Sequence, residues 1–365
     1  MIETDFAIIG GGPAGLSAAI EAANAGCKVT LIDENSRPGG QLFKQIHKFF
    51  GSKDHYAGTR GIDIGIKLLG EVEKAGVEVM LDTVAYGLYP SNTIGVVRNG
   101  QNYLIKAKRI LVATGGVENA LPFPGWTLPG VMGAGAIQTM VNVNRVLPGE
   151  NILMVGSGNV GLIVSYQLLQ AGANVVALID AAPKIGGYAV HASKIRRRGV
   201  PIFTSTTILE ARGDGKVEEV VLVDLDENWK PIAGSERTVK VDVICLAVGL
   251  SPLTELVWMS GAKFTFIPSL GGHLPLHDEN MQTTIPGLYV AGDVAGVEEA
   301  STAVEEGRLA GVAVAHSLGR YTDEDALNRK MVIRARLDQL RSGPFGEGRL
   351  QAVQELVNRG KHVIN

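Results

Sequence analysis

The sequence predicts an α/β fold in which one βαβ unit is inserted into another and helices follow at the C-terminus. Residues 5–34, DFAIIGGGPAGLSAAIEAANAGCKVTLIDE, read as a buried strand, a glycine turn, a helix and a second strand that ends in an acid. Residues 151–180, NILMVGSGNVGLIVSYQLLQAGANVVALID, repeat this order. A chain of 365 residues with 45% hydrophobic content is also long enough to bury two cores.

The first unit has the glycine spacing of a dinucleotide-binding turn. Gly10, Gly12 and Gly15 form G-x-G-x-x-G between the apolar run FAII and a helix that ends at Gly26. The first glycine permits the turn, the second lets backbone approach a pyrophosphate, and the third lets helix and strand pack closely. Asp33 ends the next strand, where a carboxylate can accept both ribose hydroxyls of an adenosine.

The second unit repeats this pattern with Gly156, Gly158 and Gly161, and its following strand ends at Asp180. A carboxylate there accepts the 2'-hydroxyl of NADH and repels the 2'-phosphate of NADPH. The arginines 196–198 come too late to form a phosphate site, and we expect them to be a solvated helix end. The sequence therefore favours NAD(H) or another adenine nucleotide. A site that keeps its fold without redox turnover is the alternative.

Other motifs place the second unit inside the first. A second apolar strand, RILVATGG at 109–116, ends in a glycine turn, and TTIPGLYVAGDVAG at 283–296 presents Asp293 just before a helix-like run. Turn-rich segments near 118–125 and 249–252 mark the two crossings. We therefore predict two Rossmann-like, three-layer domains and C-terminal helices. Their expected bounds are residues 1–118 with 251–320 for the first domain, 119–250 for the inserted domain, and 321–365 for a helical extension.

These motifs, together with RPGGQL at 37–42, resemble the flavoproteins with two dinucleotide-binding domains that include thioredoxin reductase and glutathione reductase. The resemblance covers about residues 1–320 and implies that the first domain binds FAD and the inserted domain NAD(H). The residues it implies for FAD are Gly10, Gly12, Pro13, Ala14, Gly15, Asp33, Glu34, Gly40, Gln41, Val84, Ala113, Thr114, Gly115, Gly292, Asp293 and Ala300. Those implied for NAD or an adenine nucleotide are Gly156, Gly158, Asn159, Val160, Gly161 and Asp180.

Within that resemblance each segment has its own role. The acid of the G-D pair, here Asp293, binds the ribityl chain and pyrophosphate of FAD. The G-G-Q segment, residues 39–41, lies along the flavin, and the amide at the position of Ala300 meets the pyrimidine edge. No catalytic side chain is implied, because the two cofactors perform the chemistry and the protein orients them.

A closer resemblance comes from residues 117–141, VENALPFPGWTLPGVMGAGAIQTMV, read with the second unit. These segments resemble the alpha-type subunits of heterotetrameric sarcosine oxidase, dye-linked proline dehydrogenase, opine oxidase and hydrogen cyanide synthase. In that family a partner flavoprotein oxidises the amine. The resemblance implies an FAD-dependent oxidoreductase subunit that moves electrons between FAD and NAD(H) or a partner redox subunit, inside an amine or imino-acid dehydrogenase or oxidase. As partners it implies a second FAD-containing subunit, which oxidises the amine, and an iron–sulfur subunit.

Two alternatives stay open at this point. The chain could be a free-standing NADH-dependent flavin or ferredoxin-type reductase, or a nucleotide-binding assembly subunit without redox activity. Longer members of the resembled family continue into a cysteine-rich iron–sulfur domain, whose cysteines this sequence lacks. Any such cluster is therefore expected on a separate subunit.

Composition excludes several functional classes. The only two cysteines, Cys27 and Cys245, are far apart in sequence, which rules out a disulfide framework, a C-x-x-C pair and a cysteine-ligated cluster made by this chain alone. We therefore do not expect direct disulfide reduction or a metal site. The net charge of -3 gives no electrostatic case for nucleic acid. No apolar run reaches membrane-spanning length and no signal peptide is recognisable, so we expect a cytoplasmic protein.

Four histidines are further candidates. His47 and His55 follow the G-G-Q segment and could reach the flavin or a partner, although a surface position is the simpler interpretation. His273 and His277 have i, i+4 spacing, but the flanking glycine and proline favour a loop over a metal-binding helix. Cys245 lies in an apolar strand and is expected to be a small core residue.

Beyond residue 320 the sequence becomes charged and amphipathic. One helix is expected to begin behind Thr322 as its N-cap, and GEGRLQAVQELVNRG reads as another. The apolar positions of these helices either dock on their own domain or seat the partner subunits. They are Met331, Val332, Ile333, Leu337, Leu340, Leu350, Val353 and Leu356.

Overall fold

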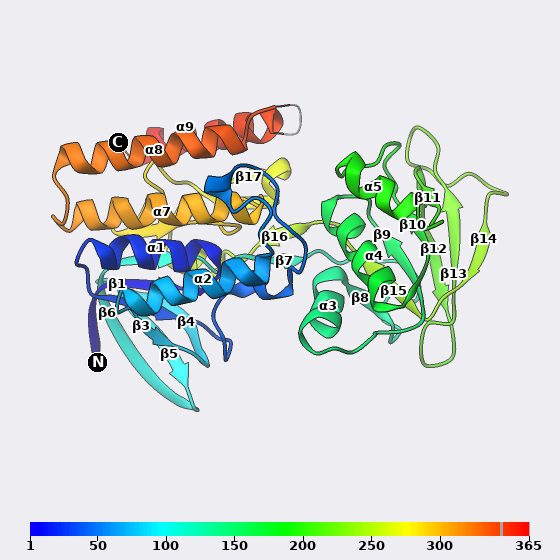
Figure 1. Cartoon of the computed structure of the whole chain (residues 1–365), viewed down its shortest axis with the longest axis horizontal. Helices are drawn as coiled ribbons and strands as arrows, with labels where there is room; N and C mark the ends of the chain where they lie inside the picture. The colour runs from blue at the N-terminus through cyan, green and yellow to red at the C-terminus, as the bar shows by residue number, and fades with distance from the viewer. Residues whose placement is uncertain (344–345, 365) are drawn as a thin grey trace. The chain divides into compact units, whose positions relative to one another are not determined.

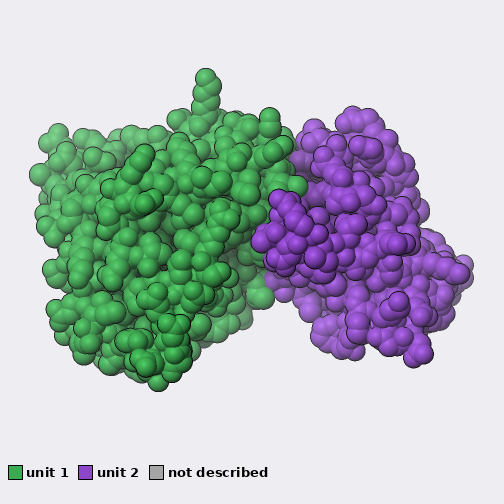
Figure 2. All heavy atoms as spheres, turned by 60° about the horizontal axis from the view of Figure 1, so that its bottom comes forward, with its two compact units in different colours: residues 1–117, 250–365 green, residues 118–249 purple. Residues whose placement is uncertain are grey.

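The computed structural model describes residues 1–343 and 346–364, which form two compact α/β units (Figures 1 and 2). Unit 1 contains Met1–Val117 and the chain from Leu250 onward, and unit 2 is Glu118–Gly249. The chain therefore leaves unit 1 once and returns to it once. Parallel-sheet Rossmann-like units followed by C-terminal helices confirm the predicted fold class.

Unit 1 is built on a seven-stranded sheet of order β3-β2-β1-β6-β5-β4, with β19 also pairing with β6. The strands β3, β2, β1, β6 and β19 run parallel, whereas β5 and β4 form an antiparallel extension. The strands are β1 Ile2–Ile9, β2 Val29–Ile32, β3 Glu78–Met80, β4 Thr83–Tyr89, β5 Thr93–Arg98, β6 Gln101–Val112 and β19 Leu288–Val290. The carboxyl ends of β1, β6 and β19 meet at one edge, where open α/β sheets bind ligands.

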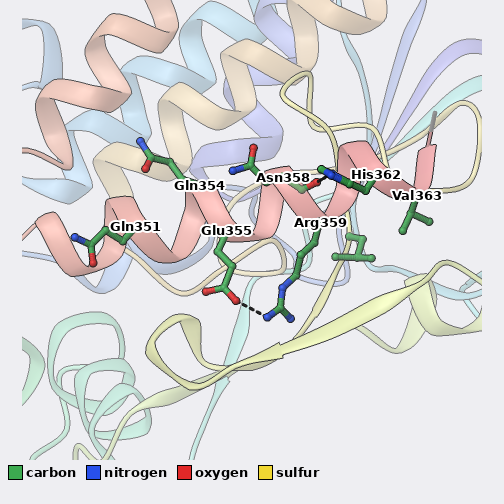
Figure 3. Close-up of a pocket in the computed structure, with 8 residues that line it drawn as sticks. Gln351, Gln354, Glu355, Asn358, Arg359, His362 and Val363 are labelled. Atoms are coloured by element: carbon green, nitrogen blue, oxygen red, sulfur yellow. Dashed lines mark hydrogen bonds and ion pairs between the residues drawn. The ribbon is translucent and has the colours of Figure 1, made fainter.

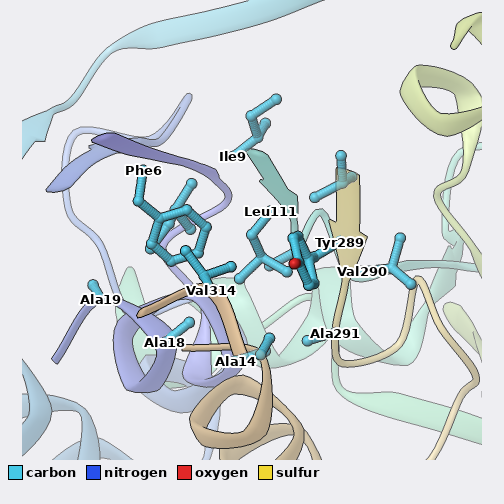
Figure 4. Close-up of a cluster of buried hydrophobic side chains, with 14 of the residues drawn as sticks. Phe6, Ile9, Ala14, Ala18, Ala19, Leu111, Tyr289, Val290, Ala291 and Val314 are labelled. Carbon is cyan, nitrogen blue, oxygen red and sulfur yellow. The ribbon is translucent and has the colours of Figure 1, made fainter. Parts of the chain in front are cut away.

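Helices α1 and α7 pack closely against each other over this sheet (Figure 1). Two glycines of α7 permit the contact, because a Cβ at Gly307 would lie 2.1 Å from the Ala14 carbonyl oxygen and one at Gly311 would lie 2.6 Å from that of Ala18. Figure 4 shows apolar side chains from these helices and the strands gathered in the core of the unit. The helices of unit 1 are α1 Pro13–Asn24, α2 Gly61–Lys74, α6 Glu255–Met259, α7 Ala300–Ser317, α8 Asp323–Leu340 and α9 Glu347–Ile364, with 3-10 turns η1 Gly40–Lys44, η2 Lys53–His55 and η4 Pro268–Leu270.

A small hairpin completes unit 1 and corrects one expectation. Strands β17 (Phe264–Ile267) and β18 (Gly272–Pro275) pair antiparallel, so His273 lies in a strand and not in the loop predicted from its neighbours. Gly272 is the first residue of β18 and Pro275 is the last, so the flanking glycine and proline mark the ends of a short strand. Two further strands, β7 Gly116–Glu118 and β16 Leu250–Pro252, lie where the chain passes from one unit to the other.

Unit 2 is a three-layer structure around the five-stranded parallel sheet β11-β10-β9-β15-β8. Alternate residues of β9 face opposite layers: Ile152 and Met154 pack with the helices, while Leu153 and Val155 pack with the three-stranded antiparallel sheet β12-β13-β14. The sequence GDG at residues 213–215 lies in the connection between the antiparallel strands β12 and β13. The elements are β8 Val131–Gly133, α3 Ala134–Gln138, the π-turn η3 Thr139–Val143, β9 Asn151–Val155, α4 Asn159–Ala171, β10 Asn174–Ile179, α5 Ala189–Arg196, β11 Ile202–Phe203, β12 Thr206–Arg212, β13 Glu219–Asp224, β14 Arg237–Lys240 and β15 Val243–Leu246.

The C-terminal helices belong to unit 1, and α8 begins as predicted. The Thr322 hydroxyl accepts a hydrogen bond from the Asp325 amide at 3.2 Å, which caps the helix. Some of the apolar residues of α8 and α9 are buried and others are exposed. Ile333 and Leu337 enter the main core of unit 1 and Leu356 joins a smaller cluster beside the β17–β18 hairpin, whereas Met331 and Val332 are exposed. Among the described residues, no helix is both long and apolar enough to cross a membrane.

Candidate functional site

The first glycine turn leaves an open position where helix α1 begins. Gly10 has φ +105°, and a Cβ there would lie 2.3 Å from the carbonyl oxygen of Ala113. A Cβ at Gly15 would lie 1.9 Å from the Gly10 oxygen, so this glycine lets the helix press against the turn. Gly12 differs, because a Cβ there would have no described atom within 4 Å apart from those of its two adjoining residues. The turn is therefore closed at its first and third glycines and open at the second, where a pyrophosphate would approach.

Asp33 is fixed beside this turn by hydrogen bonds to both carboxylate oxygens. Oδ2 accepts from the Gly11 amide at 2.6 Å, and Oδ1 accepts from the backbone and side-chain nitrogens of Asn35 at 2.8 and 2.9 Å. The carboxylate is buried at the end of β2. The acid is therefore joined to the glycine turn by a direct hydrogen bond.

Unit 2 repeats the turn with the same division of roles. Gly156 has φ +105°, and a Cβ there would lie 2.3 Å from the Ala247 carbonyl oxygen. A Cβ at Gly161 would lie 2.0 Å from the oxygen of Gly156, while Gly158 again has open space around it. Helix α4 starts behind Gly158, as α1 starts behind Gly12, and in neither helix does a described side chain cap the first turn. Pro13 has no N–H, so in α1 the amides of Ala14 and Gly15 are available to an anionic group, and in α4 those of its first turn are.

Asp180 in unit 2 corresponds to Asp33. Its Oδ2 accepts from the Ser157 amide at 2.7 Å and from the Ser157 hydroxyl at 2.5 Å, and its Oδ1 accepts from the Ala182 amide at 2.8 Å. Ser157 occupies the place in the turn that Gly11 has in unit 1. Both acids are therefore anchored to the middle of their own glycine turn.

A pair of glycines from the G-G-Q segment lies over the turn in unit 1. The Gly39 amide donates to the Gly11 carbonyl at 2.6 Å, and a Cβ at Gly40 would lie 3.0 Å from the Cα of Gly12. Gln41 is exposed beside them. The structure therefore brings residues 39–41 directly to the open side of the turn.

The same covering loop occurs in unit 2, where it was not predicted from the sequence. The Gly187 amide donates to the Ser157 carbonyl at 2.9 Å, and a Cβ at Gly186 would lie 3.8 Å from the Gly158 Cα. Asn159 accepts from the amide of Tyr188 at 2.9 Å through Oδ1. A second Gly-Gly pair shortly after the second acid was the signal that could have revealed this loop.

The Gly292–Asp293 turn lies at the same sheet edge as the first glycine turn. It follows β19, and a Cβ at Gly292, whose φ is +77°, would lie 3.1 Å from the Cβ of Ala14. Burial raises the pKa of the Asp293 carboxyl to about 6, although a hydrogen bond from the Glu298 backbone lowers it. Ala300 is the first residue of α7, so the amide end of this helix follows closely behind the turn.

A buried ionic cluster behind this turn was not foreseen from the sequence. The Arg341 side chain contacts both Glu298 and Glu306 at 2.6 Å, and the second oxygen of Glu306 accepts from the Gly292 amide at 2.9 Å. Burial raises the pKa of the Glu306 carboxyl, against the lowering effect of Arg341. No local pattern links Arg341 to Glu298, so tertiary structure alone reveals the cluster.

The remaining residues predicted for FAD lie around the same edge or beside the acid. The Ala113 amide donates to the carbonyl of Ile9 at 2.8 Å, and the Thr114 hydroxyl donates to that of Leu253 at 2.7 Å. Gly115 has φ +78°. Pro13 is the first residue of α1, Glu34 follows Asp33 on the surface, and Val84 is exposed in β4. Val160, which was predicted for the nucleotide of unit 2, is exposed in the first turn of α4.

His55 is buried, which corrects the expectation of a surface residue. The 3-10 turn η2 directs the ring inward, where Nδ1 lies 3.1 Å from the Ser52 hydroxyl and burial lowers the pKa. His47 is half-buried and stacks on Phe49 with ring centroids 5.8 Å apart. His277 is also buried, with Nδ1 2.9 Å from the carbonyl oxygen of Asp278.

The other singled-out residues behave as the sequence predicted. Cys245 is buried in the helix-side core of unit 2, and the arginines 196–198 are exposed where α5 ends. Figure 3 shows a groove elsewhere on unit 1, lined by Leu276 and by side chains of α9, among which Arg359 pairs with Glu355. None of the residues predicted to bind a cofactor lines this groove.

The fold and the site define a class of protein. Residues 4–307 match the family of pyridine nucleotide-disulphide oxidoreductases, and the chain belongs to that family. The flavoproteins of this family bind FAD and use NAD(P)H, which confirms the predicted cofactors and an FAD-dependent oxidoreductase.

Particular relatives are subunits of oxidases or synthases. The chain is 28% identical to an opine oxidase subunit of Rhizobium meliloti over 88% of this chain and 72% of that protein. It is 29% identical to hydrogen cyanide synthase subunit HcnB of Pseudomonas aeruginosa over 92% and 75% of the two chains. It is also 28% identical to the alpha subunit of sarcosine oxidase from Rhizobium meliloti, of which it spans 31%. These relatives confirm the family resemblance inferred from the motifs.

Solved structures support the fold. L-proline dehydrogenase from P. horikoshii superposes with a TM-score of 0.70 at 24% identity, over 93% of this chain and 59% of that one. Thioredoxin reductase from T. acidophilum gives a TM-score of 0.71 at 21% identity, over 87% and 99% of the two chains. The chain thus spans less than two thirds of the proline dehydrogenase chain and nearly all of the thioredoxin reductase chain.

Proposed function

We propose that this chain is a subunit that moves electrons between FAD and NAD(H), or between FAD and a partner redox subunit, within an amine or imino-acid dehydrogenase or oxidase. The main support for this proposal is that both units contain the same arrangement of glycine turn, helix start and acid. Each unit has an open glycine at a helix start, Gly12 or Gly158, and an acid anchored to the same turn, Asp33 or Asp180. Two such cradles suit an oxidoreductase that uses two dinucleotides.

Unit 1 fits FAD at several positions. The free amides at the start of α1 would face the diphosphate, and Asp33 would accept the ribose hydroxyls of the adenosine. Asp293 would accept hydrogen bonds from the ribityl chain, and the amide of Ala300 would meet the pyrimidine edge. When bound, FAD supplies the acceptance and release of hydride, while these residues hold and orient it.

Unit 2 fits NADH better than NADPH. The three hydrogen bonds that fix Asp180 keep its carboxylate beside the glycine turn, where it would accept the 2'-hydroxyl of the adenosine ribose. A 2'-phosphate would place its charge against this carboxylate. The hydrogen bonds to Asp180 come from Ser157 and Ala182, whereas the arginines 196–198 lie exposed at the end of α5.

We further propose that the chain does not reduce disulfides directly. That reaction needs a reactive thiolate and normally a second cysteine. Cys27 is buried in unit 1 and Cys245 in unit 2, and burial raises the pKa of both thiols. Neither residue therefore has the exposed, acidic character of a redox-active cysteine.

The partners proposed are a second, FAD-containing subunit that oxidises the amine, together with an iron–sulfur subunit. The support comes from the relatives, which are named as subunits of opine oxidase, hydrogen cyanide synthase and sarcosine oxidase. The sequence has no cysteine cluster with which to bind an iron–sulfur centre by itself.

The test is purification with and without the products of neighbouring reading frames. We expect a yellow protein with a flavin spectrum, anaerobic bleaching of that spectrum by NADH, and dye reduction by sarcosine or L-proline only when a partner co-purifies. A protein that takes up no added FAD would refute the proposal. A partner-free monomer that reduces dyes rapidly from NADH would identify a free-standing reductase. A flavin that no nucleotide or amine reduces, even with partners present, would identify an assembly subunit.

A further inference from the structure

Helix α8 ends in a buried arginine that contacts two glutamates of unit 1. Arg341 donates through Nε and Nη2 to both oxygens of Glu298, at distances between 2.6 and 3.1 Å, and through Nη2 to Glu306 at 2.6 Å. All three side chains are less than 10% exposed. Contacts of this kind are strong because the charges are shielded from water and the guanidinium fork matches a carboxylate.

Each of the two glutamates in turn contacts the Gly292–Asp293 turn. Glu306 accepts from the Gly292 amide at 2.9 Å through the oxygen that does not contact Arg341. The backbone of Glu298 lies close enough to the Asp293 carboxyl to lower its pKa. Arg341 is therefore linked by hydrogen bonds through Glu306 to the Gly292 amide, and its other partner, Glu298, lies beside Asp293.

We propose that Arg341 is a positioning residue for the flavin site: with Glu298 and Glu306 it holds the Gly292–Asp293 turn in the conformation that binds FAD. This inference rests on the proposed function, since it assumes that Asp293 binds the ribityl chain. It makes the docking of α8 a condition for tight FAD binding. A C-terminal helix that never reaches the cofactor thereby acts on the cofactor site.

Arg341 lies outside the part of the chain that matches the family. The family match ends at residue 307, so Glu298 and Glu306 lie within it and Arg341 lies beyond it. The turn and its two glutamates lie within the matched span. The arginine that pairs with both of them comes from the part of the chain that follows this span.

Glu306 offers an isosteric probe. Its two oxygens accept from two different donors, the Gly292 amide and the Arg341 guanidinium. A glutamine amide has only one acceptor oxygen, and its nitrogen is a donor. Glu306→Gln can therefore satisfy one of these donors but not both, while the pair between Arg341 and Glu298 stays in place to dock α8.

The experiment measures the dissociation constant of FAD from apoprotein by flavin fluorescence at pH 8, for the wild type, Arg341→Met, Asp293→Ala and the double variant. Arg341→Met should weaken FAD binding about tenfold, ~1.4 kcal/mol. If Arg341 acts through Asp293, this factor should fall to about threefold or less in the Asp293→Ala background. Arg329→Met, an exposed arginine of the same helix, is the matched control and should leave the dissociation constant unchanged.

A role of Arg341 in general stability alone would give the same factor in both backgrounds, and that result would overturn the inference. If Arg341→Met does not fold, the FAD affinity of Glu306→Gln tests the inference instead, and circular dichroism of its apoprotein checks that this variant is folded. We expect it to be folded and to bind FAD several-fold more weakly, and wild-type affinity would overturn the inference. A wild-type protein that binds no FAD refutes the proposed function itself. Normal wild-type binding with unaffected variants refutes only the role of Arg341.

Discussion

Replacing the second and the third glycine of the first turn by alanine should produce opposite failures. At Gly12 the backbone has φ -75° and ψ -174°, which alanine adopts without strain, and no described atom beyond the adjoining residues would lie within 4 Å of the added methyl group. At Gly15 the same methyl group would lie 1.9 Å from the Gly10 oxygen. Gly12→Ala should therefore impair ligand binding, whereas Gly15→Ala should destabilise the fold.

The magnitudes follow from these surroundings. For Gly12→Ala, alanine restricts the unfolded chain but is a poorer N-cap than glycine, so the two effects oppose each other and the apoprotein should change in stability by less than about 1 kcal/mol. The methyl group would occupy the approach of the diphosphate, and we expect FAD affinity to fall at least about 100-fold, ~2.7 kcal/mol. Gly15→Ala forces α1 away from the turn by more than a side-chain adjustment can absorb, which should lower the unfolding free energy by roughly 1–3 kcal/mol or more.

The assay combines urea unfolding of apoprotein with FAD titration for both variants. Gly158→Ala, with φ -66° at an equally open position in unit 2, is the matched control and should leave FAD binding intact. Tight FAD binding by Gly12→Ala would show that the diphosphate does not lie at this turn. Wild-type stability of Gly15→Ala would show that helix and turn are not in the close contact described.

Three further predictions concern the remaining residues. The wild type should prefer NADH over NADPH by about 1–3 kcal/mol, and Asp180→Ala should reduce this margin in anaerobic flavin-bleaching rates; equal rates in the wild type would exclude this role for Asp180. Burial raises the pKa of the Asp293 carboxyl from 3.8 to about 6, so folded apoprotein retains a proton that the unfolded chain releases. Its unfolding free energy should therefore fall as the pH rises from about 4 to about 6, and a slope equally steep in Asp293→Asn would contradict this. Gly307→Ala should lower the melting temperature of apoprotein, because its Cβ would lie 2.1 Å from the Ala14 oxygen; an unchanged melting temperature would count against the α1–α7 contact.

Much of the geometry of the candidate cofactor site could be predicted from the sequence because its parts are local. A strand, a glycine triplet, a helix and an acid follow one another at short, fixed separations, and backbone geometry then brings Asp33 to its turn and Asp180 to its own. The start of α8 at Thr322 was likewise predictable, since an N-cap and its partner amide are three residues apart.

Tertiary structure alone decided the contacts between distant segments. Arg341 contacts Glu298 and Glu306, which lie far from it in the chain, and no periodic pattern encodes such a pairing. The same holds for the burial of His55 and for the apolar stripe of the C-terminal helices, in which Ile333 is buried while its neighbour Val332 is exposed. A helix pattern shows that one face is apolar, but which of its residues are covered depends on the shape of the surface against which the helix packs.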